Sequence, residues 1–302
     1  MMATNPHAEV TAKILAELKA GVAPWAKPWA AVKGGAPVGI PHNGKSGRPY
    51  SGANVFLLWM AMHGNPTWWE RPAFVTFKQA LDAGGHVRKG EKGNAVYYMG
   101  EITRRDERDG DEDGEGRSVR FLKRYTVFHV SQCEGLSGKL AEPATLTVEP
   151  LLRSDLAEFY DTVGALTRHG GNQAFYAPGP DLIMLPALGQ FAGEAEYHAT
   201  RLHELTHWTG GTTRLNRLPL GAKYRSNAYA FEELVAELGA ALLCAELGVE
   251  GQLRHADYIG GWIKLLSDHE RAFFSAASQA SKAVEYLRGL CLAERDQLAV
   301  AA

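Results

Sequence analysis

The chain has 302 residues, enough for two domains of ordinary size that each bury a core. Hydrophobic residues make up 45% of it and charged residues 22%, and no apolar run approaches the roughly 20 residues that cross a bilayer. Its three cysteines lie far apart, which argues against a disulfide framework and a Cys-x-x-Cys metal knuckle. The first residues have no basic start followed by an apolar core, so we expect a cytoplasmic protein without a membrane partner.

The net charge of −2 hides a difference between the two halves. Residues 1–150 hold 19 Lys and Arg against 16 Asp and Glu, whereas residues 151–302 hold 13 against 18. The segment 101–117 holds 4 basic and 8 acidic residues, so the rest of the first half stands at 15 against 8, or +7. A basic body with a detachable acidic loop indicates an anionic partner for the N-terminal half.

Helix and strand patterns alternate in residues 1–135, which predicts an α+β domain. Thr76 and Gln79 have the spacing of a capping box and mark the start of a helix. The acidic, glycine-rich segment 101–117 is expected to be a mobile loop of a hairpin. In chain order we expect helices over 6–20 and 52–62, a strand running into a helix over 74–85, and hairpin strands over 94–103 and 118–130.

Residues 136–150 are the predicted linker, and residues 151–302 form a second, mainly α-helical domain with a small sheet. A strand-like pair of segments supplies that sheet. We expect helices over 152–167, 194–209, 229–247, 255–267 and 269–289, with the strands at 172–178 and 181–186.

The stretch HELTH at 203–207 has the spacing of a catalytic metal helix. Residues four apart lie on one face of a helix, so His203 and His207 can point imidazole nitrogens at one Zn²⁺. Glu204 can activate a water as general base. The alternative is an ordinary helix with two surface or core histidines. Acidic residues at its start and Gly210-Gly211 at its end mark a well-formed helix around the motif.

A catalytic zinc needs a third protein ligand and an open position. A histidine six residues after His207 is one source, but position 213 is Thr213. The next helix offers Glu232, Glu233 and Glu237 on a largely apolar stripe, where carboxylates are costly unless paired or bound to metal. The alternative is that these glutamates are solvated helix charges.

The pattern Glu-x-x-Ala-Glu at 233–237 resembles the Glu-x-x-(Ala/Ser)-Asp signature of thermolysin-like gluzincins. That resemblance implies that Glu233 is the third ligand and that Glu237 orients a ligand histidine. Glu232 points about 100° away from Glu233 on a helix and is the weaker candidate. The segment 172–186 could supply an edge strand for a peptide substrate. Several residues could stabilise a transition-state oxyanion, and none is favoured: Tyr224, Arg225, Tyr229, His255 and Tyr258.

Five of the seven tryptophans precede residue 70 and are interleaved with basic residues. Single-stranded nucleic acid is held by stacking on aromatic faces along a basic groove, which suggests DNA binding here. The alternative is that each tryptophan belongs to the core. The candidate DNA-binding residues are Trp25, Lys27, Trp29, Lys45, Arg48, Lys78, Arg88, Lys89 and Lys92.

Four N-terminal segments, LKAGVAPWAKPW, RPYSGANVFLLW, FVTFKQALDAGGHVRKGEKG and YTVFHVSQCEGL, resemble the N-terminal domain of ArdC-type antirestriction proteins. YHATRLHELTHWTG and YAFEELVAELGAALLCAELG resemble the zincin-like metallopeptidase domain joined to it. The resemblance implies a plasmid-encoded protein of a bacterial host or conjugation recipient, which binds single-stranded DNA and protects incoming DNA from restriction. It also implies one Zn²⁺, with Mn²⁺ or another divalent ion able to replace it in vitro. Further expected partners are DNA-bound host proteins or restriction enzymes.

Two hypotheses stay open at this point. In the first, the protein is a zinc peptidase tethered to single-stranded DNA. In the second, it is a non-catalytic DNA-binding or inhibitor protein in which the metal site only braces the fold. A metal-dependent nuclease is disfavoured, because a single His₂Glu site lacks the clustered carboxylates of paired metals at phosphates.

Overall fold

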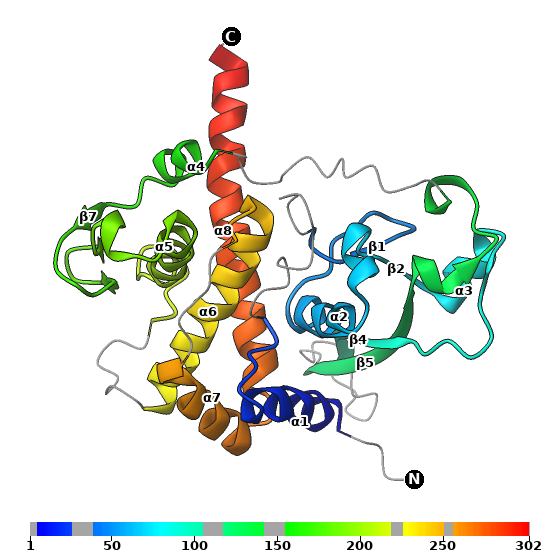
Figure 1. The fold of residues 1–302 in the computed structure, drawn as a ribbon. Helices are drawn as coiled ribbons and strands as arrows, with labels where there is room; N and C mark the ends of the chain where they lie inside the picture. The colour runs from blue at the N-terminus through cyan, green and yellow to red at the C-terminus, as the bar shows by residue number, and fades with distance from the viewer. Residues whose placement is uncertain are drawn as a thin grey trace, which may run out of the picture.

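The computed structural model describes residues 5–25, 39–104, 117–141, 155–218, 226–250 and 256–301. The strands of the N-terminal half and the helices of the C-terminal half lie on opposite sides of Figure 1, with α1 beside α7 at the bottom. The N-terminal half contains α1 (Pro6–Lys19), β1 (His42–Asn43), α2 (Ala53–His63), β2 (Ala73–Thr76), α3 (Phe77–Asp82), β3 (His86–Val87), β4 (Asn94–Arg104), β5 (Arg117–His129) and β6 (Cys133–Glu134). The C-terminal half contains α4 (Leu156–Val163), β7 (Thr167–His169), β8 (Phe175–Ala177), β9 (Leu182–Leu185), α5 (Glu194–Thr209), α6 (Asn227–Leu247), α7 (Ala256–Asp268) and α8 (Ala272–Ala301). No helix of these ranges is long and apolar enough to cross a membrane.

A four-stranded sheet with the order β1-β2-β5-β4 forms the centre of the N-terminal half. Strands β4 and β5 pair antiparallel along their whole length, from Asn94 opposite Val127 to Arg104 opposite Arg117. The Asn54 side chain of α2 exchanges two 2.8 Å hydrogen bonds with the backbone of Tyr97, and this clamps the outer edge of β4 to the helix. The N-terminal half is therefore α+β, as the sequence predicts.

Two local expectations for this half can be compared with the structure. The capping box is present, because Thr76 accepts from the Gln79 amide and the Gln79 side chain accepts from the Thr76 amide. The acidic loop is shorter than the predicted 101–117, since residues 101–104 and Arg117 belong to the paired strands. Strand pairing satisfies their backbone groups, while residues 105–116 lie outside the described ranges. Of the predicted linker, residues 136–141 are described and contain a short 3-10 turn, Gly138–Leu140.

The C-terminal half carries a small sheet with the order β7-β9-β8. The helix predicted over 152–167 is wrong at its end: Gly164 adopts φ +67° and terminates α4, and Thr167 starts strand β7 instead. Such a left-handed residue ends a helix readily when it is glycine. β7 pairs parallel with β9, and β8 pairs antiparallel with β9, so the strand-like pair expected from the sequence becomes a three-stranded sheet.

Helices α5 and α6 approach each other closely, and α6 is buried along most of its length. Gly239 permits this approach, because a Cβ at this position would lie 2.4 Å from Cγ2 of the buried Thr206. Helix α8 packs against α6 and extends well beyond the predicted residue 289. The close helix pair fixes the spacing of the side chains between α5 and α6.

One hydrophobic cluster runs through both halves of the chain. Trp25 has no exposed surface and meets Trp262 edge-on at 5.6 Å and Phe273 at 6.2 Å between ring centroids. Helix α1 packs on α7, and Thr11 donates a 2.7 Å hydrogen bond to the Glu270 carbonyl. The N-terminal helix thus contributes to the packing of the C-terminal helices.

Candidate metal centre

His203 and His207 lie one turn apart on α5 with ring centroids 4.9 Å apart. The helix begins with two acidic residues, which favour its positive N-terminal end, and stops at Gly210. Both imidazoles face α6, in keeping with the four-residue spacing. The helix period puts both histidines on one face of α5, and the side chains opposite them come from α6.

Glu233 of α6 approaches both histidines. Its Oε2 lies 3.4 Å from His203 Nε2 and its Oε1 lies 3.7 Å from His207 Nε2. One ligand atom from each of the three residues falls within 4.8 Å of the others. The structure therefore brings together the three residues that the sequence nominates as metal ligands.

Each histidine has a second carboxylate on its other ring nitrogen. Glu237 Oε2 lies 3.5 Å from His203 Nδ1, and Glu232 Oε1 lies 3.1 Å from His207 Nδ1. The later histidine thus meets the earlier glutamate. Such pairing fixes the ring orientation and leaves Nε2 for a ligand. Glu237 lies next to a candidate ligand histidine, as the sequence predicts. Glu232, the weaker candidate from the sequence, lies in the same way next to the other histidine.

Arg217 is a further residue that sequence reasoning missed. Its guanidinium lies 3.1 Å from Glu232 Oε1, donates to Thr209 Oγ1 at 2.7 Å, and donates to the Thr206 carbonyl. It thereby ties Glu232 to the C-terminal end of α5, where a cation also complements the helix dipole. The sequence could have indicated Arg217 only indirectly. Two candidate ligand histidines need two carboxylates to orient them, and the second buried carboxylate then needs a cation beside it.

The arrangement fits a divalent cation. Oε2 of Glu233 is buried and has no hydrogen bond from any described residue, and it points at the same space as the two Nε2 atoms. Two imidazoles and one carboxylate form the donor set of open catalytic zinc sites, which keep a position for water or substrate. Residues in the described ranges supply no fourth ligand to this cluster.

The titration of the cluster reflects its negative charge. Burial lowers the pKa of His207, but its contacts with Glu232 and Glu233 outweigh burial and raise it to about 9. Burial also opposes protonation of His203, and Glu233 and Glu237 nonetheless hold its pKa well above the usual value. Burial raises the pKa of Glu233, yet the two facing histidines hold it well below its usual range. The site is built to hold positive charge.

Glu204 is buried, with 6% of its surface exposed, and burial raises its pKa. The backbone of Tyr176 in β8 lies close enough to Glu204 to oppose this rise in pKa. β8 is an outer strand of its sheet among the described residues. A candidate general base and a candidate substrate edge therefore lie near each other.

Two of the five oxyanion-donor candidates are described near the ligands. Burial and the Glu233 carboxylate raise the pKa of the Tyr229 hydroxyl, which also faces Tyr258. Tyr224, Arg225 and His255 lie outside the described residues. Tyr229 therefore lies beside the Glu233 carboxylate.

The predicted DNA-binding residues separate into three groups. Trp25 is wrong as a stacking residue, because its fully buried ring fills the core between the two halves. Arg88 is also tied up: it pairs with Glu91 at 2.5 Å and donates to the Ser131 carbonyl at 2.6 Å. Lys27 and Trp29 lie outside the described residues. The remaining candidates are exposed, namely Lys45 (paired with Asp82 at 3.0 Å), Arg48, Lys78, Lys89 and Lys92.

Comparison with known proteins agrees with this two-part architecture. Residues 4–128 match the family described as the N-terminal domain of anti-restriction factor ArdC, and residues 154–279 match a zincin-like metallopeptidase family. The metal-free crystal structure of antirestriction protein ArdC from plasmid R388 is 34% identical with a TM-score of 0.77, over 95% of this chain and 98% of that one. The Mn(II)-bound structure of that protein is 33% identical with a TM-score of 0.75, over the same shares.

Curated relatives extend the comparison. Protein y4eC of Sinorhizobium fredii is 36% identical over 294 residues, which cover 94% of this chain and 92% of that one. A DNA primase TraC of Escherichia coli is 38% identical over 299 residues, which cover 93% of this chain but 27% of the primase. The chain thus spans about a quarter of that primase. With its N-terminal α+β domain and its zincin-like helical domain, the chain belongs to the ArdC antirestriction family.

Proposed function

We propose that this chain is a metal-dependent peptidase that binds single-stranded DNA and protects incoming plasmid DNA from restriction. The observation that carries the peptidase part is the convergence of His203, His207 and Glu233 within 4.8 Å beside the buried Glu204. The Mn(II)-bound structure of the R388 protein supports a divalent ion as the occupant. Zinc is the proposed physiological ion, because His₂Glu is a donor set typical of catalytic zinc.

The proposed mechanism assigns each residue one task. His203, His207 and Glu233 hold the ion, which when bound polarises a substrate carbonyl and acidifies a water. Glu237 and Glu232 accept the Nδ1 protons of the two histidines and keep both Nε2 atoms turned inward. Glu204 takes a proton from the attacking water and delivers it to the leaving amine. Its raised pKa brings it closer to the range in which a carboxyl group both accepts and releases a proton.

Strand β8 provides the proposed substrate edge. A peptide that pairs with an outer strand is held by main-chain hydrogen bonds and needs no particular sequence. The proximity of the Tyr176 backbone to Glu204 supports this assignment, because it brings the strand near the proposed general base. The proposed substrate is therefore an extended segment of a protein, such as a host protein or restriction enzyme encountered on DNA.

Glu204→Gln tests the peptidase. The variant keeps the shape of the side chain but removes the base, so we expect metal content to stay unchanged while cleavage of an unfolded protein falls at least about 100-fold. Glu194→Gln at the exposed start of the same helix is the matched control and should keep full activity. Metal analysis by mass spectrometry and a gel-based cleavage assay with zinc or manganese give both readouts. Full cleavage activity in Glu204→Gln would contradict the assignment.

The second candidate is a non-catalytic protein in which the ion braces α5 against α6. The burial of several charged groups between these helices favours it, because an unpaired carboxylate there would be costly without a cation. A plasmid-transfer assay into a restricting host separates the two functions. Loss of protection in Glu204→Gln supports proteolysis, and full protection together with loss in metal-ligand variants supports the bracing role.

A further inference from the structure

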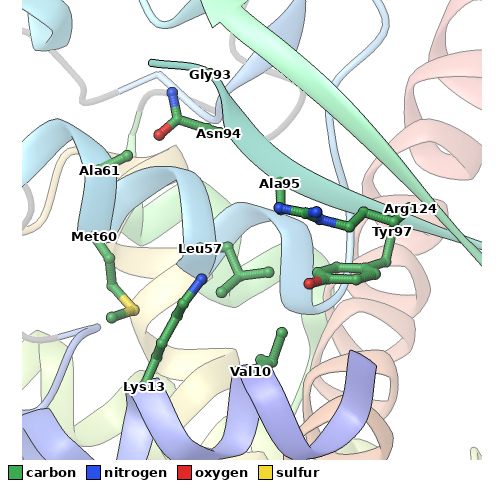
Figure 2. Close-up of a pocket in the computed structure, with 10 residues that line it drawn as sticks. All are labelled: Val10, Lys13, Leu57, Met60, Ala61, Gly93, Asn94, Ala95, Tyr97 and Arg124. Carbon is green, nitrogen blue, oxygen red and sulfur yellow. The ribbon is translucent and has the colours of Figure 1, made fainter. Parts of the chain in front are cut away.

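The two faces of the β4–β5 ribbon differ in what they touch. Side chains alternate between faces along a strand, so Tyr97 and Arg124 share one face and Tyr98 and Lys123 share the other. Figure 2 shows that Tyr97 and Arg124 reach into the space between the ribbon and helices α1 and α2, a cavity of about 280 Å³. The first face therefore lies over α1 and α2. On the opposite face Val96 and Val127 are also buried, at 5% and 1% exposed, so the outer face is defined here as the part that carries Tyr98, Phe121, Lys123 and Tyr125.

The outer face carries aromatic rings. Tyr98 is 57% exposed and Tyr125 is 40% exposed, whereas Tyr97 on the inner face is only 6% exposed. Phe121, half-buried, lies diagonally across from Tyr98 with a centroid distance of 6.3 Å. Three rings thus follow one another along the outer face, from Tyr125 through Tyr98 to Phe121. Exposed rings in a row are unusual on a monomer surface and mark an interaction site.

The position of the Phe121 ring depends on a glycine. Gly100 is its cross-strand partner, and a Cβ there would lie 2.4 Å from Phe121 Cζ and 2.9 Å from Tyr98 Cε1. The ring therefore lies over the glycine backbone, next to Tyr98. Because residue 100 has no side chain, β4 leaves space for the Phe121 ring beside the strand.

One cation, Lys123, stands among the rings of this face. Lys123 is directly opposite Tyr98, and its ammonium group lies 5.1 Å from the centroid of the Tyr125 ring. It forms no ion pair with a described residue. Aromatic rings interleaved with cations match a ligand that has flat bases and a phosphate backbone.

We propose that the outer face of the β4–β5 ribbon is a stacking platform for single-stranded DNA, on which Tyr125, Tyr98 and Phe121 receive unstacked bases and Lys123 pairs with a phosphate. The proposal rests on the DNA binding proposed above and names its site. A duplex hides its base faces, so this platform selects single strands. A protein partner fits less well, since the centres of protein interfaces are depleted of lysine.

The first experiment measures binding of a fluorescent oligo(dT) by anisotropy at several salt concentrations. Tyr98→Ala and Tyr125→Ala are each expected to weaken binding about tenfold, and Tyr98→Phe to keep it, because the ring and not the hydroxyl stacks. Lys123→Gln should reduce the salt slope by about 0.7. Phe77→Ala removes a ring that is 53% exposed elsewhere in the same half and should leave binding unchanged.

Gly100→Val is the second variant, because it keeps every ring but displaces Phe121 and should also weaken binding. Cross-linking of 5-bromodeoxyuridine oligonucleotides, mapped by mass spectrometry, should mark peptides of β4 and β5. If wild-type protein binds no single-stranded DNA, the proposed DNA-binding function fails together with its site. If the wild type binds while the ring variants bind equally well, or cross-links fall elsewhere, the platform alone is overturned. A change of oligomeric state without a change in DNA affinity would point to a second copy as occupant and would also overturn it.

Discussion

The metal centre and the β4–β5 ribbon present their chemical groups in opposite ways. At the metal centre, Glu204, Glu233 and Glu237 are each at most 6% exposed and are held by partners on two packed helices. On the ribbon, Tyr98 and Tyr125 stand in solvent on a strand pair whose inner face holds the fold together. A buried charged side chain is stable only when partner groups lie at fixed positions around it. An exposed aromatic ring needs only a strand that holds it at the surface.

This difference has a practical consequence. Substitutions of the residues proposed to hold or orient the ion should affect metal affinity, cleavage and stability together, because the same contacts serve all three. Substitutions on the outer face of the ribbon should affect DNA binding alone. Variants of either region test this contrast.

His203→Ala should abolish metal binding and cleavage but leave DNA binding intact. Removal of a ligand is expected to lower metal affinity by more than about 100-fold, beyond the effect of losing an outer partner, and to eliminate cleavage. Oligo(dT) affinity should stay within twofold or so of wild type, since the ribbon does not depend on the ion. Chelator competition and anisotropy measure the two quantities. His269→Ala, at an exposed position, is the control, and a parallel loss of DNA binding in His203→Ala would show that the two regions are coupled.

Acid should destabilise the N-terminal half through His129. Its ring stacks on Trp68 at 4.7 Å, its Nε2 donates to the Arg71 carbonyl at 2.6 Å, and its Nδ1 accepts from the Ser131 amide at 3.2 Å. Burial lowers the pKa of His129 from 6.5 to about 4. The unfolded chain therefore takes up this proton first as pH falls, so the free energy of unfolding should drop by about 3 kcal/mol between pH 6.5 and pH 4, at about 1.4 kcal/mol per unit.

Urea unfolding at a series of pH values measures this loss. His129→Gln, although less stable at neutral pH, should show a smaller loss of stability over the same range. His86→Gln, at an exposed position of the same half, should keep the wild-type dependence. Equal slopes for all three proteins would mean that His129 does not carry the acid sensitivity.

Gly239→Ala should force α5 and α6 apart. The new Cβ would lie 2.4 Å from Thr206 Cγ2 and 2.8 Å from its Oγ1, and overpacking of this kind costs about 1–3 kcal/mol. Since Glu233 and Glu237 are on the same helix, metal affinity should fall as well. Gly260→Ala in α7 is the matched control, because a Cβ there meets nothing within 4 Å. Thermal unfolding with and without zinc measures both effects, and unchanged stability in Gly239→Ala would show that the helices tolerate a wider spacing.

Glu232→Gln should have the smallest effect. The amide can still accept a hydrogen bond from His207 Nδ1, but it loses the charge that pairs with Arg217. We expect metal affinity about tenfold below wild type, at the lower end of effects for partners of ligand histidines. A chelator competition titration resolves this change. Glu285→Gln on α8 serves as the control, and equal affinity in both variants would remove Glu232 from the site.

The metal centre could be largely predicted from the sequence because its spacing is local. His203, Glu204 and His207 lie within five consecutive residues, and the helix period alone puts both histidines on one face. Glu233 and Glu237 required a resemblance to a known motif. The pairing of Glu237 with His203 and of Glu232 with His207 depends on how α5 packs against α6, which no local pattern contains.

The N-terminal surface could not be predicted in the same way. Trp25 and Tyr98 are both large aromatic residues among basic neighbours, yet the first has no exposed surface and the second is 57% exposed. The end of α4 was also misplaced, because Gly164 stops the helix and the strand partner β9 then takes up Thr167.

Residue type and spacing along a single helix thus determined that His203 and His207 share one face of α5, because the helix period links sequence distance to direction in space. Tertiary structure decided which rings are exposed, which carboxylate faces which imidazole, and which strand lies beside Glu204. These features arise between segments that are distant in the chain, where burial and pairing depend on how helices and strands pack against one another.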